Sequence, residues 1–173
     1  MADPGQRPLL FLDVDGPLIP FGARTRPYPT WTHRPIAPGG DANPLLARID
    51  PAHGARLAAL PCELVWATTW EADANDLVAP RIGLPKLPVV VWPGPRSTDE
   101  QDEHAGLHWK TRTLVEWAAG RPFVWVDDEP TAVDREWVAA HHPRRALLHR
   151  VDPAHGLAGR DYAEIRRWLR RTA

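Results

Sequence analysis

The sequence of 173 residues predicts an α/β fold, a three-layer sandwich of helices around a mainly parallel five-stranded sheet. Short runs of large apolar residues recur along the chain, which is typical of strands that are buried on both faces of a parallel sheet. Helical segments lie between these runs, and such alternation gives parallel strands joined by right-handed crossovers. We expect a single domain over residues 1–173, with a proline-rich loop insertion at about residues 17–44.

The predicted strands are short and apolar. Residues 9–12 form the first, and the others cover residues 63–70, 87–92, 122–126 and 146–151. Pro88 places the third strand toward an edge of the sheet, because proline cannot donate a hydrogen bond to a neighbouring strand.

The predicted helices connect these strands. They cover residues 51–60, 73–78, 109–119, 131–140 and 161–170. Residues 93–108 are polar and contain four acids, so we expect an exposed loop with solvated charges there.

The composition limits the location and the partners of the chain. A formal net charge of -1 gives no electrostatic reason to expect binding to nucleic acid or to an anionic membrane. Cys62 is the single cysteine, which excludes an intrachain disulfide and favours a cytoplasmic location. The sequence has no apolar leader and no stretch of roughly 18 apolar residues, so we expect no membrane partner.

The loop at residues 17–44 is rich in proline, which forbids a long helix, and it contains aromatic residues. A loop of this length has a function in most compact domains, for example lining or covering a site. Arg24, Arg26 and Arg34 are therefore candidates for contact with an anionic substrate. The alternative is a surface segment whose aromatic side chains pack on the core and whose arginines are solvated.

Two strands end in acids. Asp13 and Asp15 follow the first strand directly, and Asp127, Asp128 and Glu129 follow the strand at 122–126. Carboxylates placed together repel each other unless they share a cation, and the carboxyl ends of parallel strands meet at one edge of a sheet. This pattern predicts a divalent-metal site assembled in space. A calcium loop is disfavoured, because further acids and a closing glutamate do not follow Gly16.

Two further residues fit a phosphate site. Thr68 ends the apolar run of the second predicted strand, where a hydroxyl can contact phosphate or can simply reflect β-propensity. Thr69 is the alternative at this strand end. Lys110 is predicted in the first turn of a helix, where the helix dipole disfavours a cation, so it is either accidental or held by carboxylates.

In this order the motifs resemble those of the haloacid dehalogenase (HAD) superfamily of phosphohydrolases that use an aspartate nucleophile. The resemblance covers about Leu9 to Asp128: Asp-x-Asp-Gly after an apolar strand, a strand-end Thr, a later Lys and a strand ending in Asp-Asp. It implies a Rossmann-like, HAD-type sheet with no cap domain or a minimal one. Pro17 departs from the pattern, because the superfamily usually has Thr or Val there, but no catalytic group is lost.

The resemblance also implies roles for the site residues. Asp13 resembles the nucleophile, and Asp15 the general acid that later activates water. Thr68 and Lys110 would bind the phosphoryl oxygens. Mg²⁺ would be held by Asp13, Asp128 and the carbonyl of Asp15, and Asp127 would orient Lys110 or the water on the metal.

We therefore expect a Mg²⁺-dependent phosphatase that hydrolyses a phosphomonoester through an aspartyl phosphate. The phosphorylated substrate is not identified by the sequence. A site without a cap would admit a nucleic-acid end or a phosphoprotein, although the net charge does not indicate either. The alternatives are a catalytically silent phosphate-binding or protein-interaction module of the same fold, and phosphoryl transfer to an acceptor other than water.

Overall fold

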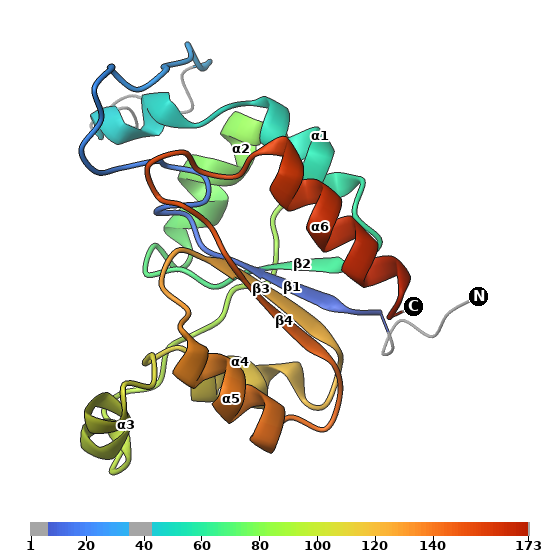
Figure 1. Cartoon of the computed structure of the whole chain (residues 1–173). Helices are drawn as coiled ribbons and strands as arrows, with labels where there is room; N and C mark the ends of the chain where they lie inside the picture. The colour runs from blue at the N-terminus through green and yellow to red at the C-terminus, as the bar shows by residue number, and fades with distance from the viewer. Residues whose placement is uncertain (1–6, 35–42, 173) are drawn as a thin grey trace.

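A computed structural model of the chain describes residues 7–34 and 43–172. Its sheet has four parallel strands in the order β2-β1-β3-β4 (Figure 1). They are β1 (Leu9–Leu12), β2 (Glu63–Trp66), β3 (Phe123–Asp127) and β4 (Ala146–Arg150). The two strands predicted to end in acids, β1 and β3, are neighbours in the middle of the sheet.

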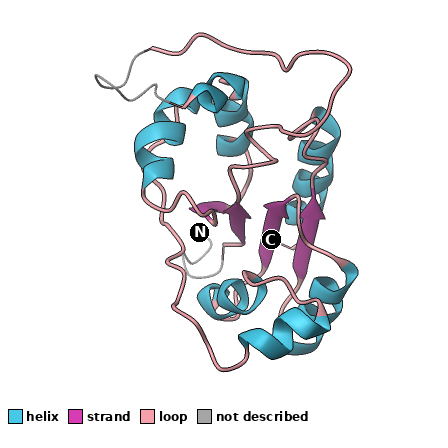
Figure 2. Cartoon of the chain, turned by 90° about the vertical axis from the view of Figure 1, so that its left-hand side faces the viewer, coloured by secondary structure: helices cyan, strands magenta, loops and turns pink. Residues whose placement is uncertain are grey.

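Helices cover both faces of the sheet, which gives the predicted three layers (Figures 1 and 2). On one face lie α1 (Ala52–Ala58), α2 (Ala79–Ile82) and α6 (Gly159–Arg170), and on the other α4 (Thr111–Ala118) and α5 (Ala132–His141). A 3₁₀ turn, Pro44–Arg48, precedes α1, and a π-helical turn, Ala74–Val78, precedes α2. In the described part of the chain, no helix has both the length and the apolar character needed to cross a membrane.

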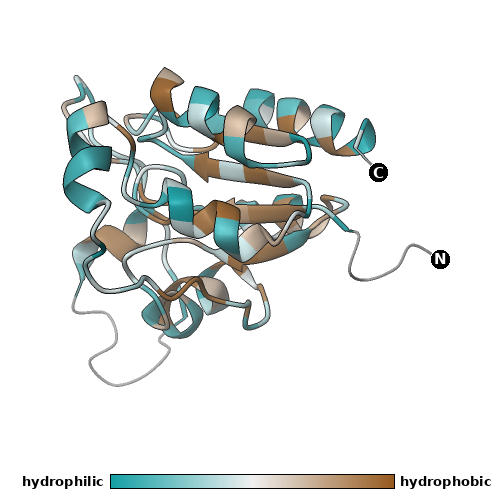
Figure 3. Cartoon of the chain, turned by 90° about the horizontal axis from the view of Figure 1, so that it is seen from below, coloured by the Kyte–Doolittle hydropathy of each residue, from teal (hydrophilic) through white to brown (hydrophobic). Residues whose placement is uncertain are grey.

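The side chains of β1 divide between two apolar cores. Leu10 and Leu12 belong to the core under α1, α2 and α6, and Leu9 and Phe11 to the core under α4 and α5. All four are fully buried. A central strand that is covered on both faces needs a continuous apolar sequence, which is why this segment is so easily recognised. Figure 3 shows apolar strands between helices whose outer faces are polar.

The prediction of a fifth strand at residues 87–92 is wrong. This segment does run parallel to β2, but it forms only an isolated bridge between Trp66 and Val89. Two hydrogen bonds make it, from Trp66 N to Pro88 O and from Val90 N to Trp66 O, each 2.9 Å. Because Pro88 has no N–H group and further prolines follow at 93 and 95, pairing does not extend into a ladder.

The prediction of an exposed loop over residues 93–108 is also wrong in part, because α3 (Asp99–Ala105) forms within it. Asp99, Glu100 and Asp102 lie in the first turn, where the helix dipole favours acids. Gly106 ends the helix with a φ of 77°. Asp102 accepts hydrogen bonds from Arg112, which fasten α3 to α4. The acids are thus part of a helix start, and α3 projects from the body of the molecule (Figure 1).

Residues 17–34 contain no helix and no strand but are fixed by backbone hydrogen bonds. Leu157 N donates to Pro17 O at 2.9 Å, Phe21 N to Pro153 O at 2.8 Å, and Trp31 N to Ala47 O at 2.8 Å. The first part of the predicted proline-rich loop therefore lies alongside the segment that precedes α6. Its later part, residues 35–42, lies outside the described residues.

A buried carboxylate joins the starts of α4 and α5. Asp134 is fully buried and accepts four hydrogen bonds. The donors are His108 N (2.8 Å), Thr111 Oγ1 (2.6 Å), Thr131 N (2.8 Å) and Thr131 Oγ1 (3.0 Å). Burial alone would raise the pKa of Asp134, but these hydrogen bonds hold it below the ordinary value of 3.8. Asp134 thereby fixes the segment that carries Lys110.

We predict that Asp134→Asn lowers the free energy of unfolding by about 1–3 kcal/mol at pH 7, because an amide nitrogen cannot accept these hydrogen bonds. A carboxyl whose pKa is depressed in the folded state stabilises above its unfolded pKa and loses this contribution as pH falls through the folded pKa. The difference from the wild type should therefore shrink below pH 3.8. Urea unfolding, followed by circular dichroism between pH 7 and about pH 3, measures this difference in the free energy of unfolding.

The matched control is Asp76→Asn, which removes an exposed ion pair with Lys86 at 3.4 Å and should change stability little. If Asp134→Asn were as stable as the wild type at pH 7, or if the difference grew in acid, the role of Asp134 would be wrong.

Candidate active site at the carboxyl edge of the sheet

The two acidic strand ends lie side by side. β1 and β3 pair in parallel with Leu12 beside Val126, and Asp13 N donates to Val126 O at 3.0 Å. Asp13 and Asp127 therefore lie side by side at the carboxyl edge of the sheet. In Figure 2 the strands end at this edge, and loops follow them. The pairing of parallel strands thus produces the predicted convergence.

Lys110 lies between these two acids. Its Nζ is 3.1 Å from Asp13 Oδ2 and 2.8 Å from Asp127 Oδ2, and the residue is 2% exposed. Burial alone would lower the pKa of Lys110, but the two carboxylates raise it above its ordinary value. The lysine therefore carries a permanent positive charge, held by carboxylates.

Asp127 is the anchor of this ion pair. It is fully buried, its Oδ2 also accepts from Trp125 Nε1 at 3.0 Å, and its Oδ1 accepts from Glu129 N at 3.1 Å. The position of its carboxylate is thus fixed from its own strand and from the turn that follows. This geometry agrees with the predicted role of Asp127 in orienting Lys110.

Asp13 is buried but not saturated with hydrogen bonds. Its Oδ1 accepts from Val14 N at 2.8 Å, and its Oδ2 faces Lys110. Burial, assisted by the charge of Asp127 and opposed by Lys110, raises the pKa of Asp13 to about 7. Burial and the charges of Asp127 and Glu129 raise the pKa of Asp128 to about 6. The acids together outweigh the one ammonium group.

The acids form a cluster suited to a cation. Asp13, Asp127 and Asp128 each offer a carboxylate oxygen, and these atoms lie within 4.8 Å of one another. Three carboxylates against one lysine leave excess negative charge, and an all-oxygen donor set suits Mg²⁺. The residues therefore fit a divalent cation. The sequence predicted Asp127 to lie near the metal, where it would orient Lys110 or the water on the metal, and its carboxylate belongs to this cluster. The side chain of Asp15 does not belong to it.

Gly16 allows Asp128 to approach the first motif. A Cβ atom at this position would lie 2.6 Å from Asp128 Oδ1, and the φ of Gly16 is +90°. Both the close contact and the left-handed backbone exclude an ordinary side chain. The glycine of Asp-x-Asp-Gly thus creates the space in which the second acidic strand end meets the first.

The side chain of Asp15 lies outside this cluster and is held by an indole. Trp70 Nε1 donates to Asp15 Oδ2 at 2.9 Å, which leaves the other carboxylate oxygen for proton transfer. Trp70 was not among the site residues predicted from the sequence. Its signal was its position, two residues after Thr68 and at the end of the predicted strand 63–70.

The two threonines differ in burial. Thr68 is fully buried, whereas Thr69 is exposed. Thr68 Oγ1 accepts from Trp70 N at 3.2 Å, so its own proton remains available for a phosphoryl oxygen. Thr68 follows β2, next to β1, but in the described part of the chain it makes no hydrogen bond to Asp13 or Lys110.

The three arginines of the proline-rich loop are exposed. The guanidinium of Arg24 lies 5.0 Å from the ring centroid of Tyr28, which Arg48 covers at 4.2 Å. Within the described residues, Arg24, Arg26 and Arg34 form no ion pair with the acidic cluster. The structure thus leaves them at the surface.

Two tryptophans that were not predicted as site residues flank Lys110. Its Nζ is 5.9 Å from the ring centroid of Trp92 and 5.5 Å from that of Trp109. Trp92 Nε1 also donates to Thr68 O at 3.0 Å. The signal in the sequence was the adjacency of Trp109 to Lys110 in a chain with nine tryptophans.

A comparison with protein-family models supports the resemblance of the sequence motifs to the HAD superfamily. The model for the HAD domain in Swiss Army Knife RNA repair proteins matches residues 9–162, a range that includes both acidic strand ends, Thr68 and Lys110. A search of curated proteins and a search of solved structures found no match. The chain belongs to the HAD superfamily, in the family of HAD domains found in Swiss Army Knife RNA repair proteins.

Proposed function

We propose that the protein is a Mg²⁺-dependent phosphatase that hydrolyses a phosphomonoester through an aspartyl phosphate on Asp13. One observation carries the proposal: Asp13, Lys110 and the acids after β3 form one cluster although they come from distant parts of the chain. A nucleophilic carboxylate, a buried cation and a set of oxygen ligands at one sheet edge are what phosphoryl transfer to an aspartate requires.

In the first step a carboxylate oxygen of Asp13 attacks phosphorus, and the bond from phosphorus to the leaving oxygen breaks. Asp15 gives its proton to that oxygen, which leaves as an alcohol, and Asp13 carries an acyl phosphate. The Lys110 ammonium and the Thr68 hydroxyl stabilise the negative charge on the phosphoryl oxygens.

In the second step Asp15, now a carboxylate, takes a proton from water while the water oxygen attacks phosphorus. The bond between phosphorus and Asp13 breaks, so inorganic phosphate leaves and both carboxyl groups return to their starting states. The hydrogen bond from Trp70 Nε1 keeps Asp15 in place through both steps.

Asp13 and Asp128 would hold the metal, with the Asp15 carbonyl or Asp127 as a further ligand. When bound, Mg²⁺ supplies the positive charge that lets an anionic phosphate approach a group of carboxylates. Lys110 alone cannot balance these acids, so the chain's own residues bind phosphate poorly without a cation.

The geometry favours catalysis over a silent phosphate-binding module. A binding module has no need for acids at both Asp13 and Asp15, because carboxylates repel phosphate, and no need for a tryptophan that holds Asp15 in place. The same pair is what a nucleophile and a general acid require.

The family description directs the choice of substrate toward a phosphorylated end of RNA. In this proposal the exposed residues Arg24, Arg26, Arg34 and Thr69 contact parts of the substrate beyond the phosphate. A cytoplasmic location fits the single cysteine.

We predict that activity depends on Mg²⁺. Hydrolysis of p-nitrophenyl phosphate and of an RNA oligonucleotide with a terminal phosphate should stop after treatment with EDTA and return when excess Mg²⁺ is added, because the acidic cluster repels phosphate. Phosphate release measures both reactions. Full turnover by a metal-stripped sample would contradict the proposal.

We further predict different defects in Asp13→Asn and Asp15→Asn. Asp13→Asn should abolish turnover. Asp15→Asn should lose about 10²–10⁴-fold in kcat, the usual contribution of general acid–base catalysis, yet still bind beryllofluoride at Asp13. Steady-state kinetics and fluorine NMR measure the two properties.

Asp76→Asn is the control, because within the described residues its exposed carboxylate pairs with Lys86 alone. An Asp15→Asn variant within a few-fold of the wild type would refute the role of Asp15, and a turning-over Asp13→Asn variant would refute the nucleophile.

A further inference from the structure

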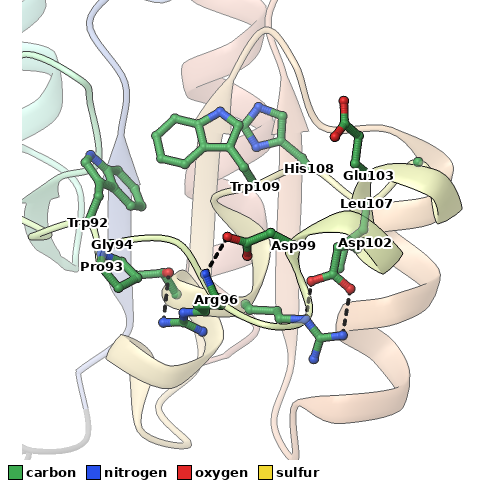
Figure 4. A pocket seen from close by; sticks show the side chains of 13 residues that line it. Trp92, Pro93, Gly94, Arg96, Asp99, Asp102, Glu103, Leu107, His108 and Trp109 are labelled. Atoms are coloured by element: carbon green, nitrogen blue, oxygen red, sulfur yellow. Dashed lines mark hydrogen bonds and ion pairs between the residues drawn. The ribbon is translucent and has the colours of Figure 1, made fainter.

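A cavity of about 520 Å³ lies beside the candidate active site. Its aromatic wall comes from Trp92, His108 and Trp109, and the acids of α3 lie across from it (Figure 4). Its volume falls in the range of roughly 300–1,000 Å³ that is typical of small-molecule sites.

Two tryptophans of the cavity wall lie next to Lys110, the lysine of the acidic cluster. The ammonium that touches Asp13 at 3.1 Å also lies 5.5 Å from the ring centroid of Trp109 and 5.9 Å from that of Trp92. Both indoles are therefore separated from the nucleophile by a single lysine head group. A group bound in the cavity would be close to a phosphate bound at Asp13.

Trp109 is prepared for contact with a planar ring. It is 52% exposed, which is high for a tryptophan, and its ring meets that of Trp92 edge-on, with the centroids 4.7 Å apart. The ring of His108 lies 5.6 Å from that of Trp109, with an angle of 31° between the two planes. His108 is itself fixed by Glu129 at 2.5 Å. The wall is thus held in place before a ligand binds.

The charges around the cavity select against an ionic ligand. Asp99, Asp102 and Glu103 line it and disfavour an anion, and both of its arginines already bind acids: Arg96 pairs with Glu116, and Arg112 with Asp102. An organic cation is disfavoured as well, because the positive charge of Lys110, 5.9 Å and 5.5 Å from the ring centroids of Trp92 and Trp109, would repel it. A neutral planar group is the chemistry that remains.

We propose that this cavity binds the nucleobase next to the scissile phosphate, by stacking on Trp109. The inference rests on the proposed phosphatase function and narrows its substrate to a nucleotide or to the terminal nucleotide of a polynucleotide. The acids of α3 can accept hydrogen bonds from the amino groups of the base. A second phosphate is repelled there, so the polynucleotide chain leaves the cavity by another route.

Binding can be tested without turnover. Adenosine, uridine, ribose and choline, none of which carries a phosphate, are each titrated into the ¹⁵N-labelled protein while the indole N–H signals are followed by NMR. The Trp109 signal is assigned by its loss in Trp109→Phe. We expect the signal to shift with both nucleosides and not with ribose. A Trp109 signal that moves with none of them, or only with choline, overturns the base-binding site whether or not the protein is a phosphatase.

Kinetics supply the second test. Base stacking on an aromatic side chain contributes about 5- to 150-fold in affinity. Trp109→Ala should therefore lower kcat/KM for adenosine 3′- and 5′-monophosphates more than for ribose 5-phosphate, by a factor in this range, and Trp109→Phe should restore most of the difference.

Phe21→Ala is the matched control, because it removes an exposed aromatic ring that does not line the cavity, and it should leave the ratio unchanged. Equal losses of Trp109→Ala on all substrates would overturn the base-binding role. Loss of all turnover in Asp13→Asn, with nucleoside binding retained, separates the cavity from the chemistry.

Discussion

The buried ion pair of Lys110 with Asp13 and Asp127 is the interaction on which the candidate site depends. One ammonium group connects the ends of β1 and β3 to the start of α4. Removing one member of such a group leaves an uncompensated buried charge, which is strongly destabilising. The surrounding contacts serve this arrangement: Trp125 fixes Asp127, and Asp134 fixes the segment that carries the lysine.

The same arrangement leaves an excess of negative charge at the site. Asp13 and Asp128 carry pKa values raised by burial and by Asp127, so the ionised cluster needs a further cation. Gly16 brings Asp128 against the turn after β1 and thus concentrates the acids further. We propose that a site built in this way binds a metal and a phosphate together, and that the aromatic wall beside Lys110 contacts the organic part of the substrate.

The features that strand patterns determine could be predicted from the sequence. An apolar run ending in acids identifies a strand end, and parallel pairing places Asp13 and Asp127 together. Features that depend on partners distant in sequence could not be predicted. The segment around Pro88 has strand composition but pairs at only one point, and α3 is completed by Arg112 from another helix. The contact of Trp70 with Asp15 joins two segments that no local pattern connects.

The central claim is that Asp13 becomes phosphorylated during turnover, and chemical trapping tests it most directly. The Asp15→Asn variant is mixed with Mg²⁺ and p-nitrophenyl phosphate, whose leaving group needs little help from an acid, then quenched and reduced with borohydride. Reduction converts an aspartyl phosphate to homoserine, which peptide mass spectrometry locates. We expect homoserine at position 13. Homoserine at another aspartate, or none in a sample that releases p-nitrophenol, would contradict the mechanism.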